Sequence, residues 1–321
     1  MTIKAIKNTI NSNDFTGGIN MEEVGLIEPV VSVSSVPGLY SFNILPESIS
    51  EQPCEIIPYK RKPNLNELLN KIINEDALIG LKNIPDESVD VVITDPPYGI
   101  AKKNSFKDKS HGTFKALDSE WDIFPSKNHY IEFTENWIKE CCRILKPTGS
   151  IAVWGSRISI FDVQPVLSQF FPKFLDMLTW IKRDSPPNMT RRGMAPSTEF
   201  CLIYTKAEKG WTFNHDDIKR YNDGKQMRNY VDIQRTMPAE ERTGHPTQKK
   251  IETQLLLVEM LSNKNEIVLD PFAGSGTLPV ACLKTDRNFI GFELNKEYYA
   301  VAKNRIKKLI NVNYKHKRNR Y

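Results

Sequence analysis

The stretch IVLDPFAGSGT, residues 267–277, decides the fold of this chain. The apolar run 267–269 predicts a buried strand, Gly274 and Gly276 predict a tight turn, and residues 277–283 predict a helix. A strand, a glycine-rich turn and a helix N-terminus together place backbone N–H groups around a ligand and let it approach closely. The stretch therefore predicts an α/β fold with a nucleotide-like ligand at this turn.

Two familiar phosphate-binding loops do not match this turn. A P-loop ends in Gly-Lys-Ser/Thr, whereas Gly276 is followed directly by Thr277. The dinucleotide fingerprint has a third glycine where this chain has Pro279. Glu293 ends the next predicted strand, Asn288–Phe292, and can accept two hydrogen bonds from ribose hydroxyls. This combination suits an adenosyl ligand without a pyrophosphate, such as S-adenosylmethionine; the alternative is a structural glycine turn with a solvent-facing glutamate.

A second motif, Asp95-Pro96-Pro97-Tyr98, directly follows another predicted strand, Val89–Thr94. Ligands of open α/β sheets bind at the carboxyl ends of the strands. Asp95 and the Pro96 carbonyl can accept the two N–H bonds of an amino group on a flat base, and Tyr98 can stack on the ring. Taken alone, the tetrapeptide is also compatible with an ordinary proline-rich turn. Together with the glycine loop it predicts an amino-methyltransferase.

Helical and strand patterns alternate through most of the chain. Leu68, Leu69, Ile72 and Ile73 recur at helical spacing and predict a helix. Further helices are predicted at 77–81, 130–145, 248–261 and 296–310, and further strands at 150–154, 175–182 and 199–206. Such alternation favours a mostly parallel sheet that is covered by helices on both faces.

Charge is distributed unevenly along the 321 residues, whose net charge is +5. Residues 1–58 contain seven acidic and two basic residues, so the rest of the chain carries +10. A basic body suits a partner with a phosphate backbone. No run approaches the ~18 apolar residues of a membrane span, no secretory signal is evident, and a cytoplasmic location is expected. The five cysteines lack the spacing of a metal or disulfide framework.

The chain resembles the β-class DNA amino-methyltransferases, in which the catalytic motif precedes the cofactor motif. The resemblance covers roughly residues 66–310 and rests on four motifs in this order: 95–98, 244–249 (Gly-His-Pro-Thr-Gln-Lys), 270–277 and 291–294. It implies a Type II or orphan DNA adenine-N6 methyltransferase that uses S-adenosyl-L-methionine. The implied fold is α/β and Rossmann-like, a seven-stranded, mostly parallel sheet with an antiparallel hairpin and circularly permuted motif order.

The resemblance also assigns expected roles to individual residues. The expected catalytic residues are Asp95, Pro96, Pro97 and Tyr98. The expected cofactor-binding residues are Asp76, Ala77, His245, Thr247, Gln248, Lys249, Asp270, Pro271, Phe272, Gly274, Ser275, Gly276, Thr277, Glu293 and Leu294. The residues expected to flank the target base are Trp180, Lys182, Pro187, Asn188 and Glu199. No metal is expected.

The predicted organisation has five parts. These are an acidic N-terminal extension (1–60), a catalytic half (61–206), a target-recognition insertion (207–243), a cofactor-binding half (244–310) and a basic tail (311–321). The expected partner is duplex DNA with the target adenine flipped out, because the amino group is buried in the base stack. A homodimer is compatible with the resemblance.

Three alternatives remain open at this point. Cytosine N4 is the nearest rival acceptor, although enzymes of that type more often resemble Ser-Pro-Pro-Tyr than the motif that begins at Asp95. A catalytically inactive DNA-binding homologue is a second alternative, and the intact Asp95, Tyr98 and Glu293 speak against it. A nicotinamide oxidoreductase is the third, and the missing third glycine speaks against that.

Overall fold

The computed structural model describes residues 63–99, 122–188, 191–238, 241–243 and 248–318, with side chains up to residue 311. The predicted acidic extension and the expected cofactor-binding residues His245 and Thr247 lie outside the described residues.

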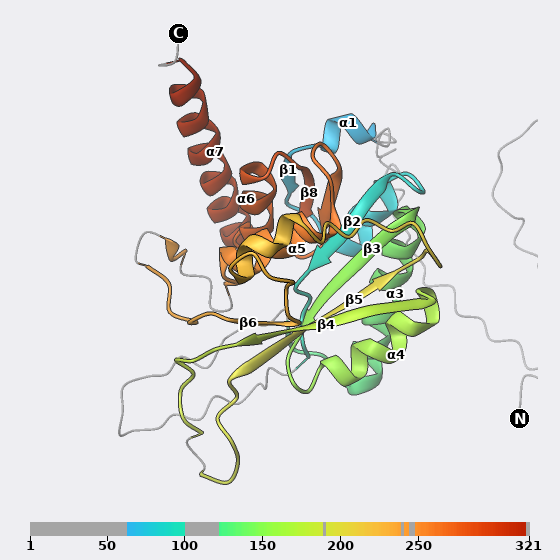
Figure 1. Ribbon diagram of the computed structural model, residues 1–321. Coiled ribbons are helices and arrows are strands. Elements are labelled where there is room, and N and C mark those ends of the chain that lie inside the picture. Colours follow the sequence, from blue (N-terminus) through green and yellow to red (C-terminus); the bar gives the residue numbers. More distant parts are fainter. Residues whose placement is uncertain (1–62, 100–121, 189–190, 239–240, 244–247, 319–321) are drawn as a thin grey trace, which may run out of the picture. The chain divides into compact units, whose positions relative to one another are not determined.

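One sheet organises the described part of the chain, and its eight strands are ordered β1-β8-β7-β2-β3-β5-β4-β6 (Figure 1). The strands are β1 (Lys71–Ile73), β2 (Val89–Thr94), β3 (Leu145–Gly155), β4 (Lys173–Ile181), β5 (Thr198–Thr205), β6 (Tyr230–Asp232), β7 (Ile267–Asp270) and β8 (Asn288–Phe292). The helices are α1 (Leu65–Leu68), α2 (Ala77–Gly80), η2 (Leu81–Asn83), α3 (Lys127–Ile144), α4 (Ile160–Phe170), η4 (Asp217–Asn222), α5 (Ile251–Leu261), α6 (Thr277–Lys284) and α7 (Lys296–Arg318).

Only β5 runs against its neighbours: it is antiparallel to both β3 and β4, whereas all other paired strands are parallel. The predicted α/β fold with a mostly parallel sheet and an antiparallel hairpin, β4–β5, is therefore confirmed. The expected seven strands gain an eighth, because β6 pairs with the free edge of β4. Its three residues lie within the predicted insertion and are too few to leave a recognisable period in the sequence.

The sheet is buried on both faces, which explains why its central strands are almost entirely apolar. Successive residues of β2 alternate between two apolar clusters: Val91 and Ile93 join one, and Val92 joins the other. Side chains of α5, α6 and α7 complete the first cluster and those of α2, α3 and α4 the second, so the helices cover opposite faces (Figure 1).

Two of the predicted elements need correction. The apolar residues at 68–73 do not form one helix, because α1 ends at Leu68 and Asn70 adopts a positive φ of 58°. The chain then continues as β1, which pairs with β8 at the edge of the sheet. The period of a short apolar run does not distinguish a helix from a strand. Here the pairing with β8 determines that residues 71–73 form a strand. The last helix extends beyond its predicted end at 310 to Arg318. No helix in the described ranges is apolar over a length that would cross a bilayer.

Candidate active site

Carboxylates follow four neighbouring strands, β1, β8, β7 and β2, at the same edge of the sheet. Asp76 lies three residues after β1, Glu293 directly follows β8, Asp270 ends β7, and Asp95 directly follows β2. Adjacent strands lie about 4.8 Å apart, so this row extends over about 14 Å of the sheet edge. The strand order therefore brings the two predicted motifs together, although they are far apart in the sequence.

A hydrogen bond joins the two motifs directly. Thr94 Oγ1 donates to Asp270 Oδ1 at 2.8 Å, and the N–H of Phe272 donates to the same oxygen at 3.1 Å. Burial raises the pKa of Asp270 to about 7, against the effect of both donors. Asp270 thus links the end of β2 to the start of the glycine loop.

Glu293 is held by the backbone around it. The N–H of Gly274 donates to Glu293 Oε2 at 2.8 Å, and the N–H of Asn295 donates to Oε1 at 2.7 Å. Burial raises the pKa of Glu293 above its ordinary value, and both backbone bonds oppose this shift. Each carboxylate oxygen can still accept another hydrogen bond.

These contacts fit the adenosyl part of S-adenosylmethionine. In a phosphate loop the backbone N–H groups point at the ligand, but the N–H of Gly274 is taken by Glu293. The site thus offers acceptors for ribose hydroxyls. Asn74 Nδ2 donates to the carbonyls of Glu293 and Leu294 at 2.7 and 3.0 Å, which ties the ends of β1 and β8 together. Leu294 is 61% exposed and offers an apolar surface to a base.

The other expected cofactor residues shape the loop and its surroundings. Asp76 caps α2 by accepting the N–H of Leu78 at 2.8 Å, and Ala77 is the first, buried residue of that helix. Phe272 packs edge-on against Trp137 of α3, with ring centroids 5.6 Å apart. Pro271, Ser275 and Thr277 are buried.

Arg305 was not found from the sequence. It reaches from α7 to the glycine loop and donates to the Ser275 carbonyl at 2.7 Å and to Thr277 Oγ1 at 3.2 Å. It lies in the predicted helix 296–310 among several lysines, and no pattern distinguishes it from them.

Gly276 is required by both backbone conformation and packing. Its φ is +77°, and a Cβ there would lie 2.9 Å from the Cβ of Ala302. Gly224 has the same φ of +77°, but a Cβ there would meet nothing within 4 Å. We expect Gly224→Ala to cost only the left-handed backbone strain, about 1–2 kcal/mol. Gly276→Ala should cost about 1–3 kcal/mol more from overpacking. Urea unfolding of the two variants measures the difference, and equal losses would contradict a packing role for Gly276.

Asp95 lies at the centre of a network of alternating charges. Tyr98 O–H donates to Asp95 Oδ1 at 2.5 Å, and Lys249 Nζ donates to Oδ2 at 2.6 Å. Lys249 also lies 3.0 Å from Glu199 Oε2, and Lys182 Nζ donates to Glu199 Oε1 at 2.8 Å. The network joins the ends of β2 and β4, the start of β5 and the segment before α5.

Burial and ion pairing compete for the charges of this network. Burial raises the pKa of Asp95, although Lys249 opposes the shift. Burial also raises the pKa of Glu199, but the ion pairs with Lys249 and Lys182 outweigh it and hold that pKa at about 2. Burial lowers the pKa of Lys249, and the attraction of both carboxylates outweighs it, so the net shift is upward. Glu199 and Lys249 are therefore charged at neutral pH.

The turn that carries Asp95 is fixed by a residue that the sequence reasoning missed. Asp122 Oδ1 accepts the N–H groups of Tyr98 and Gly99, at 2.5 and 2.7 Å. Asp122 is buried and follows a polar stretch without periodicity, so no pattern marked it. Pro96 and Pro97 are also buried, which leaves the side chains of Asp95 and Tyr98 as the partly exposed groups of the turn.

Lys249 and Gln248, both expected to bind the cofactor, have different partners. The side chain of Lys249 lies in the network around Asp95. The Gln248 amide instead accepts from the N–H of Thr243 at 2.9 Å and donates to the carbonyl of Glu241 at 2.8 Å. Gln248 thus ties the segment before α5 to residues 241–243.

Of the residues expected to flank a base, two belong to the network, one lies beside it and two lie on the loop between β4 and β5. Trp180 lies edge-on to Trp154, with ring centroids 6.5 Å apart, and Lys249 Nζ lies 5.7 Å from the Trp154 ring. Lys182 and Glu199 belong to the network itself. Pro187 and Asn188 lie on the loop that joins β4 to β5.

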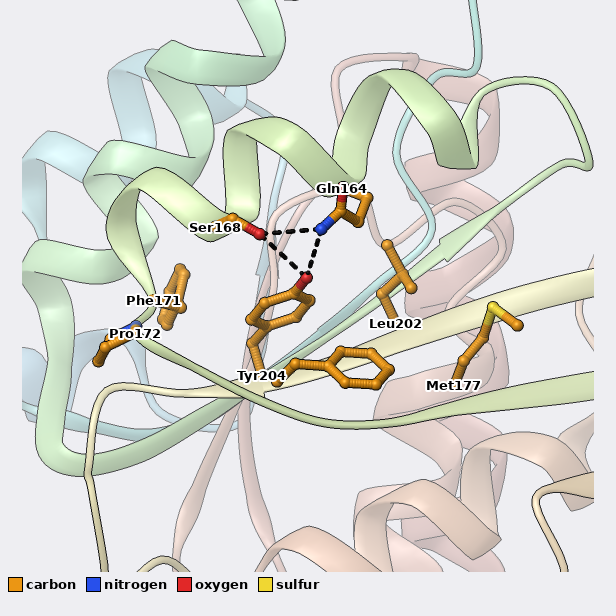
Figure 2. A pocket seen from close by; sticks show the side chains of 8 residues that line it. Gln164, Ser168, Phe171, Pro172, Met177, Leu202 and Tyr204 are labelled. Carbon is orange, nitrogen blue, oxygen red and sulfur yellow. Dashed lines mark hydrogen bonds between the residues drawn. The ribbon is translucent and has the colours of Figure 1, made fainter.

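A hollow of about 460 Å³ between α4 and the β4–β5 hairpin contains none of the expected residues. Figure 2 shows Tyr204 in this hollow, with its hydroxyl 3.1 Å from Gln164 Nε2 and 3.2 Å from Ser168 Oγ. Tyr204 pairs with Phe174 near the start of β4, whereas Glu199 pairs with Trp180 near its end. The hollow therefore lies toward the start of β4, away from the strand ends that carry the network around Asp95. Among the described residues, no group of three or more His, Cys, Asp or Glu side chains could hold a metal ion.

Known proteins match this arrangement over most of the chain. The DNA methylase family N6_N4_Mtase matches residues 89–304. Type II methyltransferase M.HinfI of Haemophilus influenzae is 35% identical over 256 residues, which cover 77% of this chain and 71% of that protein. Type II methyltransferase M2.DpnII of Streptococcus pneumoniae is 33% identical over 249 residues, which cover 76% of this chain and 92% of that protein.

Solved structures agree with these relatives. A complex of M1.HpyAVI with S-adenosylmethionine has a TM-score of 0.56 at 28% identity and covers 74% of this chain and 98% of that one. The cytosine-N4-specific PvuII DNA methyltransferase shares the fold, with a TM-score of 0.57 at 18% identity over 75% of this chain and 91% of that one. The family resemblance and the cofactor predicted from the sequence are confirmed. The chain belongs to the N6/N4 DNA methylase family and is an S-adenosylmethionine-dependent Type II DNA amino-methyltransferase.

Proposed function

We propose that the protein methylates the N6 amino group of adenine in duplex DNA, with the target base flipped into the site around Asp95. The observation that carries this proposal is the position of Asp95, a carboxylate at the sheet edge beside the glycine loop, with Tyr98 hydrogen-bonded to it at 2.5 Å. An aspartate at this position favours adenine over cytosine N4, whose enzymes more often resemble Ser-Pro-Pro-Tyr. The other residues that were expected to bind the cofactor or to flank the base are proposed in those roles, Lys249 excepted.

The chemistry requires the amino nitrogen to be aimed correctly, because its lone pair is delocalised into the ring. S-adenosylmethionine supplies an electrophilic methyl group on sulfur. Asp95 and the Pro96 carbonyl accept the two N–H bonds, which fixes the nitrogen and stabilises positive charge that develops on it. Such positioning can supply about 7–11 kcal/mol of barrier reduction. Pro96 and Pro97 are buried and stiffen the turn that carries these acceptors.

We further propose that the insertion 207–243 and the loop between β4 and β5 contact the DNA. That loop exposes Arg191, Arg192 and Met194, and Met194 is 93% exposed. Arginines neutralise backbone phosphates, and apolar side chains can enter between unstacked bases. Both segments adjoin β4, whose end carries Lys182 of the network around Asp95.

The acceptor base can be identified directly. DNA is methylated with labelled cofactor, digested, and its nucleosides are separated, while methylation-sensitive long-read sequencing of DNA from expressing cells gives the sequence context. We expect N6-methyladenine in one recurring sequence. Recovery of N4-methylcytosine would contradict the proposed acceptor and leave the family assignment intact.

Tyr98 offers a test of stacking. Tyr98→Phe keeps the ring and loses the hydrogen bond to Asp95, whereas Tyr98→Ala loses both. Because base–aromatic stacking contributes about 1–3 kcal/mol, we expect Tyr98→Ala to lower kcat/KM about tenfold or more below Tyr98→Phe. Single-turnover methylation of an oligonucleotide with the identified site measures both. Equal losses would assign the role to the hydroxyl.

A further inference from the structure

Lys249 occupies the place that the proposed function reserves for the amino group of the base. Its Nζ lies 2.6 Å from Asp95 Oδ2, a distance typical of a charge-assisted hydrogen bond. Asp95 Oδ1 is already bonded to Tyr98. The ammonium also donates to Tyr98 O–H at 3.0 Å and lies 5.4 Å from the centre of the ring proposed to stack on the base. A base amino group must therefore displace Lys249 from Oδ2 before it can donate there.

Glu199 offers the displaced ammonium a second acceptor. Its Oε2 lies only 3.0 Å from Lys249 Nζ, yet this buried oxygen accepts no hydrogen bond of adequate geometry from the described residues. The ion pair with Lys249 compensates this oxygen only in part, so a well-aligned hydrogen bond from the ammonium would stabilise it further. Lys182 holds the other oxygen of Glu199 at 2.8 Å, so the carboxylate stays in place when Lys249 moves.

We propose that Lys249 is a positioning residue that holds Asp95 before the base enters and turns to Glu199 Oε2 when the base amino group replaces it. This inference rests on the proposed function, since it needs an amino group as the entering donor. Both carboxylates keep a hydrogen-bond donor during this movement. Asp95 exchanges the Lys249 ammonium for the base amino group, and Glu199 gains a hydrogen bond from the ammonium.

The exchange also selects among bases. Adenine and cytosine carry an amino donor at the position that would face Asp95, whereas guanine and thymine carry a carbonyl oxygen there. Only the first two can replace the hydrogen bond that Asp95 loses when Lys249 leaves. A carbonyl would face a carboxylate that has lost its donor, so the exchange disfavours bases that lack an amino group at this position.

The test compares two DNA duplexes that contain the recognition sequence identified by long-read sequencing. One duplex carries adenine at the target position. The other carries an abasic site there, so no base amino group enters and Lys249 need not be displaced. The ratio of the two affinities, measured by fluorescence anisotropy, reports base entry and cancels general effects on folding and backbone binding. We call this quantity the adenine/abasic ratio.

Three variants have different expected effects on the adenine/abasic ratio. Lys249→Met should raise it about tenfold, which corresponds to about 1.4 kcal/mol, because no ammonium has to be displaced. Glu199→Gln should lower it, because the displaced ammonium loses its charged acceptor. Lys146→Met is the matched control: it removes a lysine that pairs with Asp90 at the other end of β2, outside the network around Asp95, and it should leave the ratio close to that of the wild type.

Two results for Lys249→Met would overturn the inference. A lower ratio in Lys249→Met would mean that the lysine contacts the base directly, and an unchanged ratio would mean that it only supports the fold. If Lys249→Met does not bind abasic DNA, Glu199→Gln decides by itself, since an unchanged or higher ratio in that variant also overturns the inference. Failure of the wild type to methylate adenine would instead overturn the proposed function.

Discussion

Replacement of Asp95 by asparagine should lower kcat by about 10²–10³-fold and leave the affinity for S-adenosylmethionine nearly unchanged. Asparagine keeps the shape of the side chain and an oxygen for the Tyr98 hydroxyl. Its NH₂ group, however, replaces Oδ2, so it donates where the amino group of the base must donate. Asp95→Ala should abolish transfer, because it removes both acceptor oxygens of the side chain. Single-turnover methylation measures the transfer step, and titration calorimetry measures cofactor affinity.

Asp90→Asn is the matched control for this prediction. Asp90 lies in the same strand as the catalytic turn, but near its other end, where it pairs with Lys146 at 2.6 Å and accepts the N–H of Ile267 at 2.9 Å. Loss of its charge should lower the free energy of unfolding by about 1 kcal/mol or less, the contribution of a partly exposed ion pair. It should leave kcat unchanged. If Asp95→Asn retained wild-type activity, Asp95 would have no part in transfer. If it lost cofactor binding as well, its role would be structural.

The sequence was sufficient to predict the strands that carry the site. The bounds predicted for β2, Val89–Thr94, and β8, Asn288–Phe292, are those of the structure. Both strands are covered on both faces, so their sequences are nearly continuous apolar runs with clear ends. The proximity of Asp95 to the glycine loop followed from a general rule, because ligands of α/β sheets bind at the carboxyl ends of strands.

Elements at the margins of the sheet were harder to predict. β1 and β6 are edge strands of three residues each, and their pairing with β8 and β4 determines their conformation more than their own sequences do. The helix α4 was missed although Ile160, Val163 and Val166 follow a helical period, because Pro165 interrupts the pattern.

The contacts of Lys249 illustrate what local patterns do not contain. The resemblance at 244–249 predicted that this lysine binds the cofactor, but it did not predict the contacts with Asp95 and Glu199. Its partner Asp95 is 154 positions away, and Glu199 lies on a third segment. Only the order of the strands brings these three residues together, and that order is not encoded in any single stretch.

Asp270 leads to a prediction about stability and pH. Burial raises its pKa to about 7, whereas an aspartate in an unfolded chain has a pKa of about 3.9. Between these values the folded protein retains a proton that the unfolded chain has released. The stability associated with this group is therefore fully present below pH ~4 and is lost as the pH rises through ~7. Each unit of difference between the two pKa values corresponds to about 1.4 kcal/mol of unfolding free energy.

Asp270→Asn should abolish this loss of stability at higher pH. The asparagine oxygen can accept the hydrogen bonds from Thr94 and Phe272 that Asp270 now accepts, and the side chain cannot ionise. We expect the free energy of unfolding of the variant, relative to the wild type, to rise by about 2–4 kcal/mol between pH 4.5 and pH 8, measured by urea unfolding. Thr94→Val removes a donor to the carboxylate and should raise the pKa of Asp270 further, so that the loss extends to higher pH. Parallel pH profiles for the wild type and Asp270→Asn would mean that Asp270 is already ionised in the folded protein throughout this range.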